Sequence, residues 1–259
     1  MLCRDDYASH FVRGLPFFKG MPESDLDCFL SAAAIKIQPK NAPLFHHGDM
    51  ADRIFVVLGG WIKVFRNTEE GDEAIIALFS RGDVFGEAAL FSGGHYPFSA
   101  QVAEESRLIE IPGALVKERA KANPDIMTRV MHSMSREMHK LQMEIEHMAI
   151  MSAPQRVGCL LLQLSSGMVG QGGTLLFPYD KSLAAARLGM KPETFSRALS
   201  QLRPLGVTSK GTEINIESFY GLAEYCCGSC SAELDDCKGA IRRLCSEIGC
   251  PAYKEKTAI

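Results

Sequence analysis

A change in the spacing of apolar residues after Asn123-Pro124 most constrains how this chain can fold. Beyond that point, apolar side chains recur at steps of three and four residues over about six helical turns. The pattern predicts one long helix with an apolar stripe made of Ile126, Val130, Met134, Met138, Leu141, Ile145 and Met148. Such a stripe can cover the sheet of its own domain or pair with a second copy of the chain. The length and the heptad-like spacing favour a parallel dimer.

The residues before this helix read as short strands separated by glycine turns. Between residues 35 and 111, apolar and polar residues alternate, as they do around Ile54 and Val56. Three glycines stand where a turn needs a positive φ or little bulk: Gly48, Gly71 and Gly82. This pattern predicts an antiparallel β-roll, and therefore an α+β fold for the chain as a whole.

Beyond the long helix, the sequence predicts a winged helix-turn-helix. "MSAP", residues 151–154, breaks the helix, because the residue before proline avoids the α region. A helix at about residues 155–165 and a short strand lead to two short helices joined by a glycine turn. Pro192 falls in the first turn of the second short helix, where proline is favoured. A hairpin with Lys210-Gly211 at its tip follows and forms the wing.

These changes of pattern predict four segments. They are a β-roll sensor domain (1–122), a dimerisation helix and hinge (123–152), a winged helix-turn-helix DNA-binding domain (153–222) and a cysteine-rich tail (223–259). Between residues 153 and 222, seven Lys or Arg residues stand against four Asp or Glu residues, a net charge of +3, whereas the whole chain carries −3. A basic segment inside an acidic protein indicates that this domain binds phosphate.

Glu193, Ser196 and Arg197 form the candidate DNA-reading face. They lie at i, i+3 and i+4 in the N-terminal half of the second short helix, which is the half that reads the major groove. Arg197 can donate two hydrogen bonds to guanine, Glu193 can accept one from cytosine, and Ser196 can contact thymine or phosphate. Lys191 and Thr194 are neighbouring candidates. Without its context, the trio also fits an ordinary amphipathic helix with a Glu193–Arg197 surface pair.

The order of β-roll, long helix and winged helix, with "GDVFGEAALF" and "KPETFSRALSQL", closely resembles the Crp/Fnr family of bacterial transcription regulators over roughly residues 15–222. The resemblance implies a homodimer that binds double-stranded DNA and contacts RNA polymerase. Glu193 to Arg197 match the "E..SR" pattern of the Fnr branch, which implies TTGAT half-sites in an inverted repeat, TTGAT-N4-ATCAA. Pro192 replaces the arginine of cyclic-AMP-type readers, and "PETFSR" is most similar to the branch that regulates denitrification and the response to nitric oxide.

The effector pocket that the resemblance implies corresponds to Gly86, Glu87, Phe98 and Ser99. In cyclic-nucleotide-binding members, a glutamate bonds the ribose hydroxyl and an arginine pairs with the cyclic phosphate. This chain keeps Gly86-Glu87 but has Phe98 where that arginine would stand. A phosphate buried there would lack its charge-assisted partner. We therefore expect that cyclic AMP does not bind, and that Glu87 has a packing or capping role.

Haem is an alternative sensory cofactor in the family. His46, His47 and His95 are placed on turns of the predicted roll and are possible ligands, as are Cys3 and Cys28. No Cys-x-x-Cys-His attachment motif is present in the sequence.

Six of the nine cysteines lie between residues 226 and 250. Four are candidate metal ligands: Cys227, Cys230, Cys237 and Cys245. The Cys227-x2-Cys230 spacing lets two thiolates reach one metal or cluster. The resemblance implies a [4Fe-4S] cluster that responds to oxygen or nitric oxide, and it implies this position because only Cys3 and Cys28 precede the roll, so the usual N-terminal cluster site of the Fnr type is absent. Zinc binding or a thiol-disulfide switch is a second interpretation. Packing is the third, since Cys237 and Cys245 share an apolar helical seam, whereas residues 226, 227 and 230 form an irregular group.

No run of eighteen apolar residues exists, and the N-terminus is charged, so the sequence predicts neither a membrane span nor export. We expect a cytoplasmic protein. No paired acid and base or nucleophile triad indicates an enzyme. The rival function from another class is a redox or metal-handling protein that uses the tail thiols. A cyclic-nucleotide-binding module without transcriptional output is a further rival.

Overall fold

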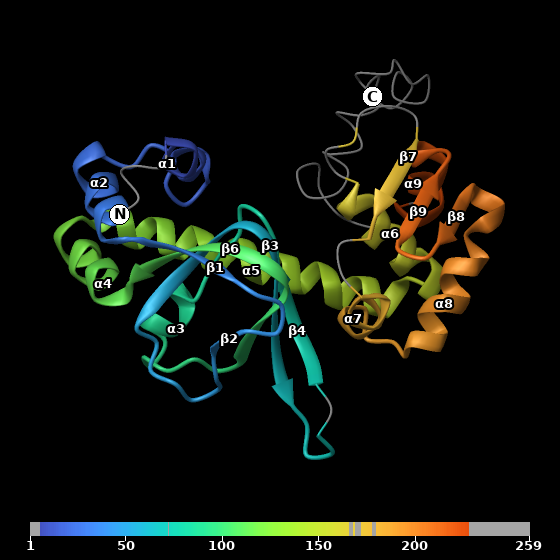
Figure 1. The fold of residues 1–259 in the computed structure, drawn as a ribbon, viewed down its shortest axis with the longest axis horizontal. Coiled ribbons are helices and arrows are strands. Elements are labelled where there is room, and N and C mark those ends of the chain that lie inside the picture. The colour runs from blue at the N-terminus through green and yellow to red at the C-terminus, as the bar shows by residue number, and fades with distance from the viewer. Residues whose placement is uncertain (1–5, 72, 166–167, 169–171, 178–179, 228–259) are drawn as a thin grey trace. The chain divides into compact units, whose positions relative to one another are not determined.

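The computed structural model describes residues 6–71, 73–165, 168, 172–177 and 180–227. The chain divides into two compact units, Met1–His139 and Lys140–Ile259 (Figure 1). The division falls inside the long helix, so that helix contributes residues to both units. Among the described residues, no helix is long and apolar enough to cross a membrane.

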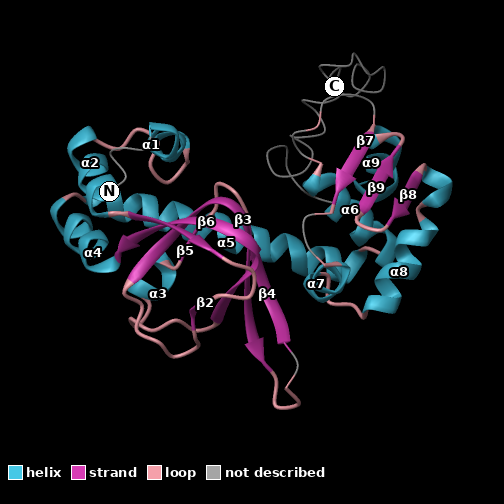
Figure 2. Cartoon of the chain, in the orientation of Figure 1, coloured by secondary structure: helices cyan, strands magenta, loops and turns pink. Residues whose placement is uncertain are grey.

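The first unit is an antiparallel β-sheet with short helices around it (Figure 2). Its strands are β1 (Ala34–Gln38), β2 (Pro43–Phe45), β3 (Arg53–Asn67), β4 (Glu73–Phe79), β5 (Val84–Phe85) and β6 (Ser99–Pro112). Its helices are α1 (Asp6–Gly14), α2 (Glu23–Ala32), α3 (Glu87–Phe91) and α4 (Gly113–Ala122). The strand order is β1-β6-β3-β4, with β2 paired to β6 and β5 to β3. The predicted antiparallel β-roll is confirmed, and the three predicted turn glycines all have φ between 87° and 95°.

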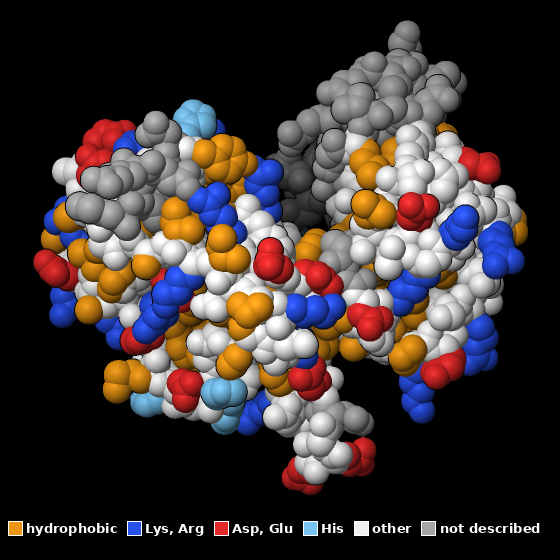
Figure 3. Space-filling view, viewed as in Figure 1, with side chains coloured by type: hydrophobic (Ala, Val, Ile, Leu, Met, Phe, Trp, Pro, Cys, Tyr) orange, Lys and Arg blue, Asp and Glu red, His pale blue; other side chains and the backbone are white. Residues whose placement is uncertain are grey.

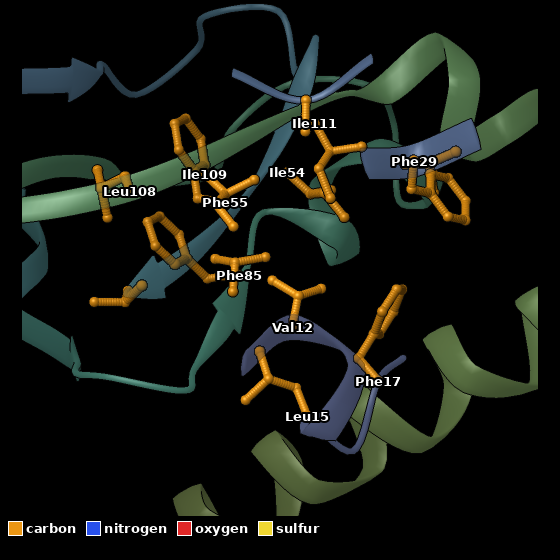
Figure 4. Packing of buried hydrophobic residues seen from close by; sticks show 14 of the residues in the cluster. Val12, Leu15, Phe17, Phe29, Ile54, Phe55, Phe85, Leu108, Ile109 and Ile111 are labelled. Carbon is orange, nitrogen blue, oxygen red and sulfur yellow. The ribbon is translucent and has the colours of Figure 1, made fainter. Parts of the chain in front are cut away.

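The core of this unit lies between the sheet and the N-terminal helices. Figure 4 shows Val12, Leu15 and Phe17 from the N-terminal segment pointing toward the side chains of the sheet. Phe55 and Phe85 stack with their ring centroids 4.9 Å apart. Neither α1 nor α2 was predicted from the sequence, although both contribute fully buried side chains.

A buried ionic contact joins α2 to the end of α4. Asp25 is 3% exposed, accepts a hydrogen bond from Nδ2 of Asn123 at 2.7 Å, and forms an ion pair with Arg119. The hydrogen bonds from Arg119 and Asn123 hold the pKa of Asp25 below its usual value. The contact fixes these helices beside the start of the long helix.

The long helix, α5, runs from Pro124 to Ile150 as predicted, but its apolar residues form two neighbouring stripes rather than one. Ile126, Val130 and Ser133 are buried, at spacings of four and three residues. The second stripe is exposed and consists of Met134, Met138, Leu141, Ile145 and Met148. The buried stripe therefore covers its own domain, which was the alternative interpretation, whereas the residues of the second stripe are each at least 39% exposed. We call the second set the exposed stripe.

The second unit begins with the end of α5 and continues as a helix-turn-helix with a three-stranded sheet. Its helices are α6 (Ala153–Leu164), α7 (Lys181–Arg187), α8 (Pro192–Gln201) and α9 (Phe219–Cys227), with a 3₁₀ turn at Arg203–Leu205. Its strands are β7 (Gly173–Leu176), β8 (Val207–Lys210) and β9 (Glu213–Ile216), in the order β7-β9-β8. The predicted break is confirmed, because α5 ends at Ile150 and the N–H of Ser152 donates to Oε1 of Gln155 at the start of α6. The predicted wing hairpin is β8 and β9, and β7 pairs with β9 as a third strand.

The last described helix corrects the predicted irregular group of cysteines. Cys226 and Cys227 lie in the final turn of α9. Cys226 is fully buried, and a Cβ on Gly158 would collide with its sulfur, so the glycine lets α9 approach α6 closely. The cause is an apolar segment that packs as a helix, as Leu222 and Cys226 are both buried at a spacing of four residues. Cys230, Cys237 and Cys245 lie outside the described residues, as does the side chain of Cys227.

Candidate DNA-binding surface and effector site

The helix α8 separates its residues into a buried face and an exposed face. Phe195, Ala198 and Leu199 are buried, with Phe195 completely shielded from solvent. The ring of Phe195 meets that of Phe177 edge to face at 6.1 Å between centroids. Every apolar residue of α8 that could anchor it therefore faces inward, which leaves its other side for contacts outside the unit.

The exposed face carries the residues predicted to read DNA. Glu193, Ser196 and Arg197 are exposed in the first six residues of α8, and the turn before the helix contains Gly189, where φ is 62°. Lys191 is the exposed N-cap residue and Thr194 is half-buried. The structure thus brings the predicted trio together on one side of the helix.

The side chain of Arg197 does not pair with the carboxylate of Glu193 here. Its Nε donates a long hydrogen bond, 3.4 Å, to the main-chain carbonyl of Glu193. The predicted alternative was a side-chain pair between these two residues. The observed contact leaves the carboxylate of Glu193 and the outer edge of the guanidinium exposed to a ligand.

Basic side chains lie near α8 and the hairpin that follows it (Figure 3). Lys210 is exposed at the end of β8, and Gly211 forms the tip with φ at 61° and open space around it. Asp180 caps α7 by accepting a hydrogen bond from the N–H of Ser182 at 3.0 Å. The capped α7, the turn and α8 form the helix-turn-helix that the sequence predicted.

The predicted effector residue Glu87 is buried and bonded to α5. Glu87 is the first residue of α3 and is 5% exposed. Its carboxylate accepts a hydrogen bond from Oγ of Ser133 at 2.7 Å. Burial raises the pKa of Glu87, and the negative charge of Glu137 raises it further. The hydrogen bond from Ser133 and the positive charge of Arg136 act in the opposite direction. Gly86 precedes it with φ at 94°, and a Cβ there would approach the carbonyl of Arg53 to 3.2 Å. Only glycine fits this turn without strain.

The other two predicted effector residues are engaged elsewhere in the roll. Phe98 is half-buried and packs against the hydrophobic core. Oγ of Ser99 accepts a hydrogen bond from the backbone N–H of His47 at 3.0 Å. The structure shows no hydrogen bond between Glu87 and Ser99 in the described part of the chain, so the four residues are not joined into one polar site.

Two family models match the chain, and each falls on one part of the fold. Residues 36–123 match a cyclic nucleotide-binding domain, and residues 155–225 match a Crp-like helix-turn-helix domain. The fumarate and nitrate reduction regulatory protein of Escherichia coli is 31% identical over 192 residues, which cover 71% of this chain and 75% of that protein. The chain belongs to the Crp/Fnr family. Members of this family bind DNA as dimers and regulate transcription, so this chain is a DNA-binding transcription regulator.

Other Crp/Fnr proteins are similar along most of their length. The cyclic AMP receptor protein of Thermus thermophilus is 29% identical over 204 residues, 77% of this chain and 91% of that protein. A crystal structure from Ruegeria pomeroyi, provisionally described as a cyclic nucleotide binding protein, has a TM-score of 0.65 at 33% identity and covers 84% of this chain and 96% of its own. FixK2 of Bradyrhizobium japonicum has a TM-score of 0.67 at 21% identity over 74% and 96% of the two chains, which shows the fold alone.

The possible haem ligands of this Crp/Fnr chain do not form a pocket. His46, His47 and His95 are all exposed, and Nε2 of His47 lies 3.5 Å from a guanidinium nitrogen of Arg66. Cys28 is half-buried, and Cys3 lies outside the described residues. Among the described residues, no group of three or more His, Cys, Asp or Glu side chains is arranged to hold a metal ion. The histidines therefore do not fit a buried haem.

Ser133 is the residue of this site that sequence reasoning missed. The predicted seam passed from Val130 to Met134, and the polar residue between them was not considered. The signal was present, because Ile126, Val130 and Ser133 continue one face at steps of four and three residues. A small polar residue on a buried helical face calls for a hydrogen-bonding partner, and that partner is Glu87.

Glu87→Gln should change how the stability of the protein depends on pH. The folded-state pKa of Glu87 is raised above its ordinary value of 4.5. The contribution of this carboxyl to the free energy of unfolding is therefore fully present below pH 4.5 and is lost as pH rises through the folded-state pKa. Relative to E87Q, the wild type should therefore lose unfolding free energy with rising pH. Urea unfolding from about pH 5 to about pH 8 measures this difference.

Two further variants complete the test. Ser133→Ala leaves the buried carboxyl without its donor and should cost about 1–3 kcal/mol. Glu105→Gln, at an exposed position on β6, is the control and should follow the pH dependence of the wild type. If E87Q and the wild type show parallel pH dependence, the carboxyl of Glu87 is not held in the buried state described.

Proposed function

We propose that this regulator binds, as a homodimer, an inverted repeat of TTGAT half-sites, TTGAT-N4-ATCAA, with α8 in the major groove. The observation that carries the proposal is the exposure of Glu193, Ser196 and Arg197 on one side of a helix whose other side is buried. Helices held in this way present the N-terminal half to base edges. The match to a Crp-like helix-turn-helix domain over residues 155–225 supports this docking geometry.

Each proposed contact follows from the chemistry of the side chain. Arg197 donates two hydrogen bonds to guanine, Glu193 accepts from the cytosine amino group, and Ser196 contacts thymine or phosphate. Lys191 and Thr194, at the start of α8, contact the phosphate backbone. The exposed Lys210 of the wing adds a further phosphate contact, which fixes the register of the domain on DNA without reading sequence.

The exposed stripe of α5 is the proposed dimer interface. Its members follow one another at steps of four, three, four and three residues, the heptad spacing of a parallel two-stranded coil. Ile145 is 63% exposed and Met138 57%, so a large apolar area faces solvent in the single chain. Burying each side chain would contribute about 1.5–3 kcal/mol. An apolar stripe of this length on a helix is stable in water when a second copy covers it.

The signal is proposed to reach the regulator by a route other than cyclic AMP. The carboxyl of Glu87 is already bonded to Ser133, and Phe98 supplies no cation for a phosphate. A [4Fe-4S] cluster held by Cys227, Cys230, Cys237 and Cys245 and sensitive to oxygen or nitric oxide stays a prediction, as does contact with RNA polymerase. A signal of this kind would act by favouring one of two dimer states that differ in how the recognition helices are spaced.

Arg197→Ala tests base reading directly. The variant should lose about 1–3 kcal/mol of binding free energy on the TTGAT repeat and should no longer discriminate at the guanine of the half-site. Fluorescence anisotropy at fixed salt, with duplexes that carry each base at that position, measures both effects.

Arg203→Ala is the matched control, because it removes the same charge from another exposed position of the same unit. It should weaken all duplexes to a similar, smaller extent and keep the preference for guanine. An equal loss on every duplex for R197A would show that Arg197 contacts phosphate and reads no base.

Ile145→Glu tests the exposed stripe. Two carboxylates in the apolar seam of the proposed coil, one from each copy, should cost the dimer about 3–6 kcal/mol, from the loss of two buried side chains. Analytical ultracentrifugation over a concentration series should show dissociation. Ser135→Glu, about 100° around the helix from Met134, adds the same charge outside the stripe and should remain dimeric. Equal dimer stability in both variants would place the interface elsewhere.

A further inference from the structure

A small cavity lies within the second unit, between the end of α5, one face of α6 and the end of α7. It has a volume of about 70 Å³, and its charged lining residues include Glu144, Arg156 and Arg187. A single water needs roughly 10–15 Å³ on this measure, so the cavity has room for several waters or one small ion. It is too small for a nucleotide.

Arg156 is the residue that makes this cavity a binding site. Its Nε atom is shielded from solvent and has no hydrogen-bond partner among the described residues. It lies in the first turn of α6, where the main-chain N–H groups also favour negative charge. A shielded guanidinium donor without an acceptor is unfavourable, and a ligand that accepts its hydrogen bond removes that cost.

The other charges of the cavity nearly cancel. Arg187 forms an ion pair with Glu144, so the two side chains together add no net charge to the cavity. Burial lowers the pKa of His147, which keeps this lining residue neutral near pH 7. Cys159 is buried and accepts a hydrogen bond from Nε2 of Gln163 at 3.6 Å. The net charge of the cavity lining is therefore positive, and it comes from Arg156.

We propose that this cavity binds a small oxyanion, with the guanidinium of Arg156 as its main ligand. The planar fork of donors on a guanidinium matches two oxygens of an oxyanion such as sulfate, phosphate or nitrate. The amide of Gln163 adds a second polar group to the lining. The site is separate from Glu87 and from the DNA-reading face of α8.

Binding of the oxyanion also affects binding of DNA, a consequence that rests on the proposed function. The anion lies beside the Glu144–Arg187 pair, which ties the end of α5 to α7. A second acceptor near Arg187 competes with Glu144 and changes how α7, and with it α8, is held on the helix that carries the exposed stripe. Bound oxyanion therefore alters operator affinity. Binding itself does not depend on this consequence, because it is measured without DNA.

The test titrates the full chain with sodium sulfate, phosphate or nitrate against sodium chloride at constant ionic strength. Isothermal calorimetry and thermal unfolding should show saturable binding of at least one oxyanion. Arg156→Gln should weaken that binding about tenfold or more, the loss expected for one charge-assisted contact. Arg156→Lys, which keeps the charge and loses the fork, should bind with intermediate affinity and guards against a folding defect in R156Q.

Arg66→Gln is the control, since it removes one exposed guanidinium from the roll and should leave oxyanion binding unchanged. In ¹⁵N spectra of arginine side chains, the Nε–H signal assigned through R156K should shift during the titration. No saturable effect, or an equal effect in the wild type and R156Q, overturns the site. Loss of binding in R156Q with unchanged operator affinity at every oxyanion concentration keeps the site and overturns its effect on DNA.

Discussion

The attachment of α5 to the β-roll is the interaction on which the rest of this structure depends. Ile126 and Val130 fill the core, and Ser133 donates a hydrogen bond to the buried carboxyl of Glu87. These contacts fix the rotation of the helix about its own axis. Because the exposed stripe follows on the adjacent face of the same helix, that rotation also determines which side chains are available to a second copy.

The Glu87–Ser133 bond is the structural basis of the expectation that this roll does not bind cyclic AMP. A carboxyl that is 5% exposed and already bonded has little capacity for a ribose hydroxyl, and the neighbouring strand offers Phe98 rather than a cation. The roll therefore holds α5 through its own side chains. The shared fold alone does not specify the ligand, so the expectation rests on the side chains inside the roll.

Sequence reasoning succeeded where one local pattern decides the structure. The change of period after Pro124 predicted α5, the proline at 154 predicted the break, and the turn at Gly189 with Pro192 predicted α7 and α8. It failed where tertiary contacts decide. Helix α1 is short and is stabilised by packing on the sheet. The division of the apolar residues of α5 into a buried and an exposed stripe depends on which face of the helix the roll covers. The cavity beside Arg156 joins residues from three helices and left no signal along the chain.

The most direct measurement is the affinity of the full chain for TTGAT-N4-ATCAA duplex with and without saturating cyclic AMP, at fixed salt. The proposed function predicts tight binding in both conditions, with a scrambled duplex bound at least about a thousandfold more weakly. The two operator affinities should agree, because the roll already holds α5 without a nucleotide. An operator affinity that rises tenfold or more only when cyclic AMP is present would contradict this, and would show that the bond between Glu87 and Ser133 gives way to the nucleotide.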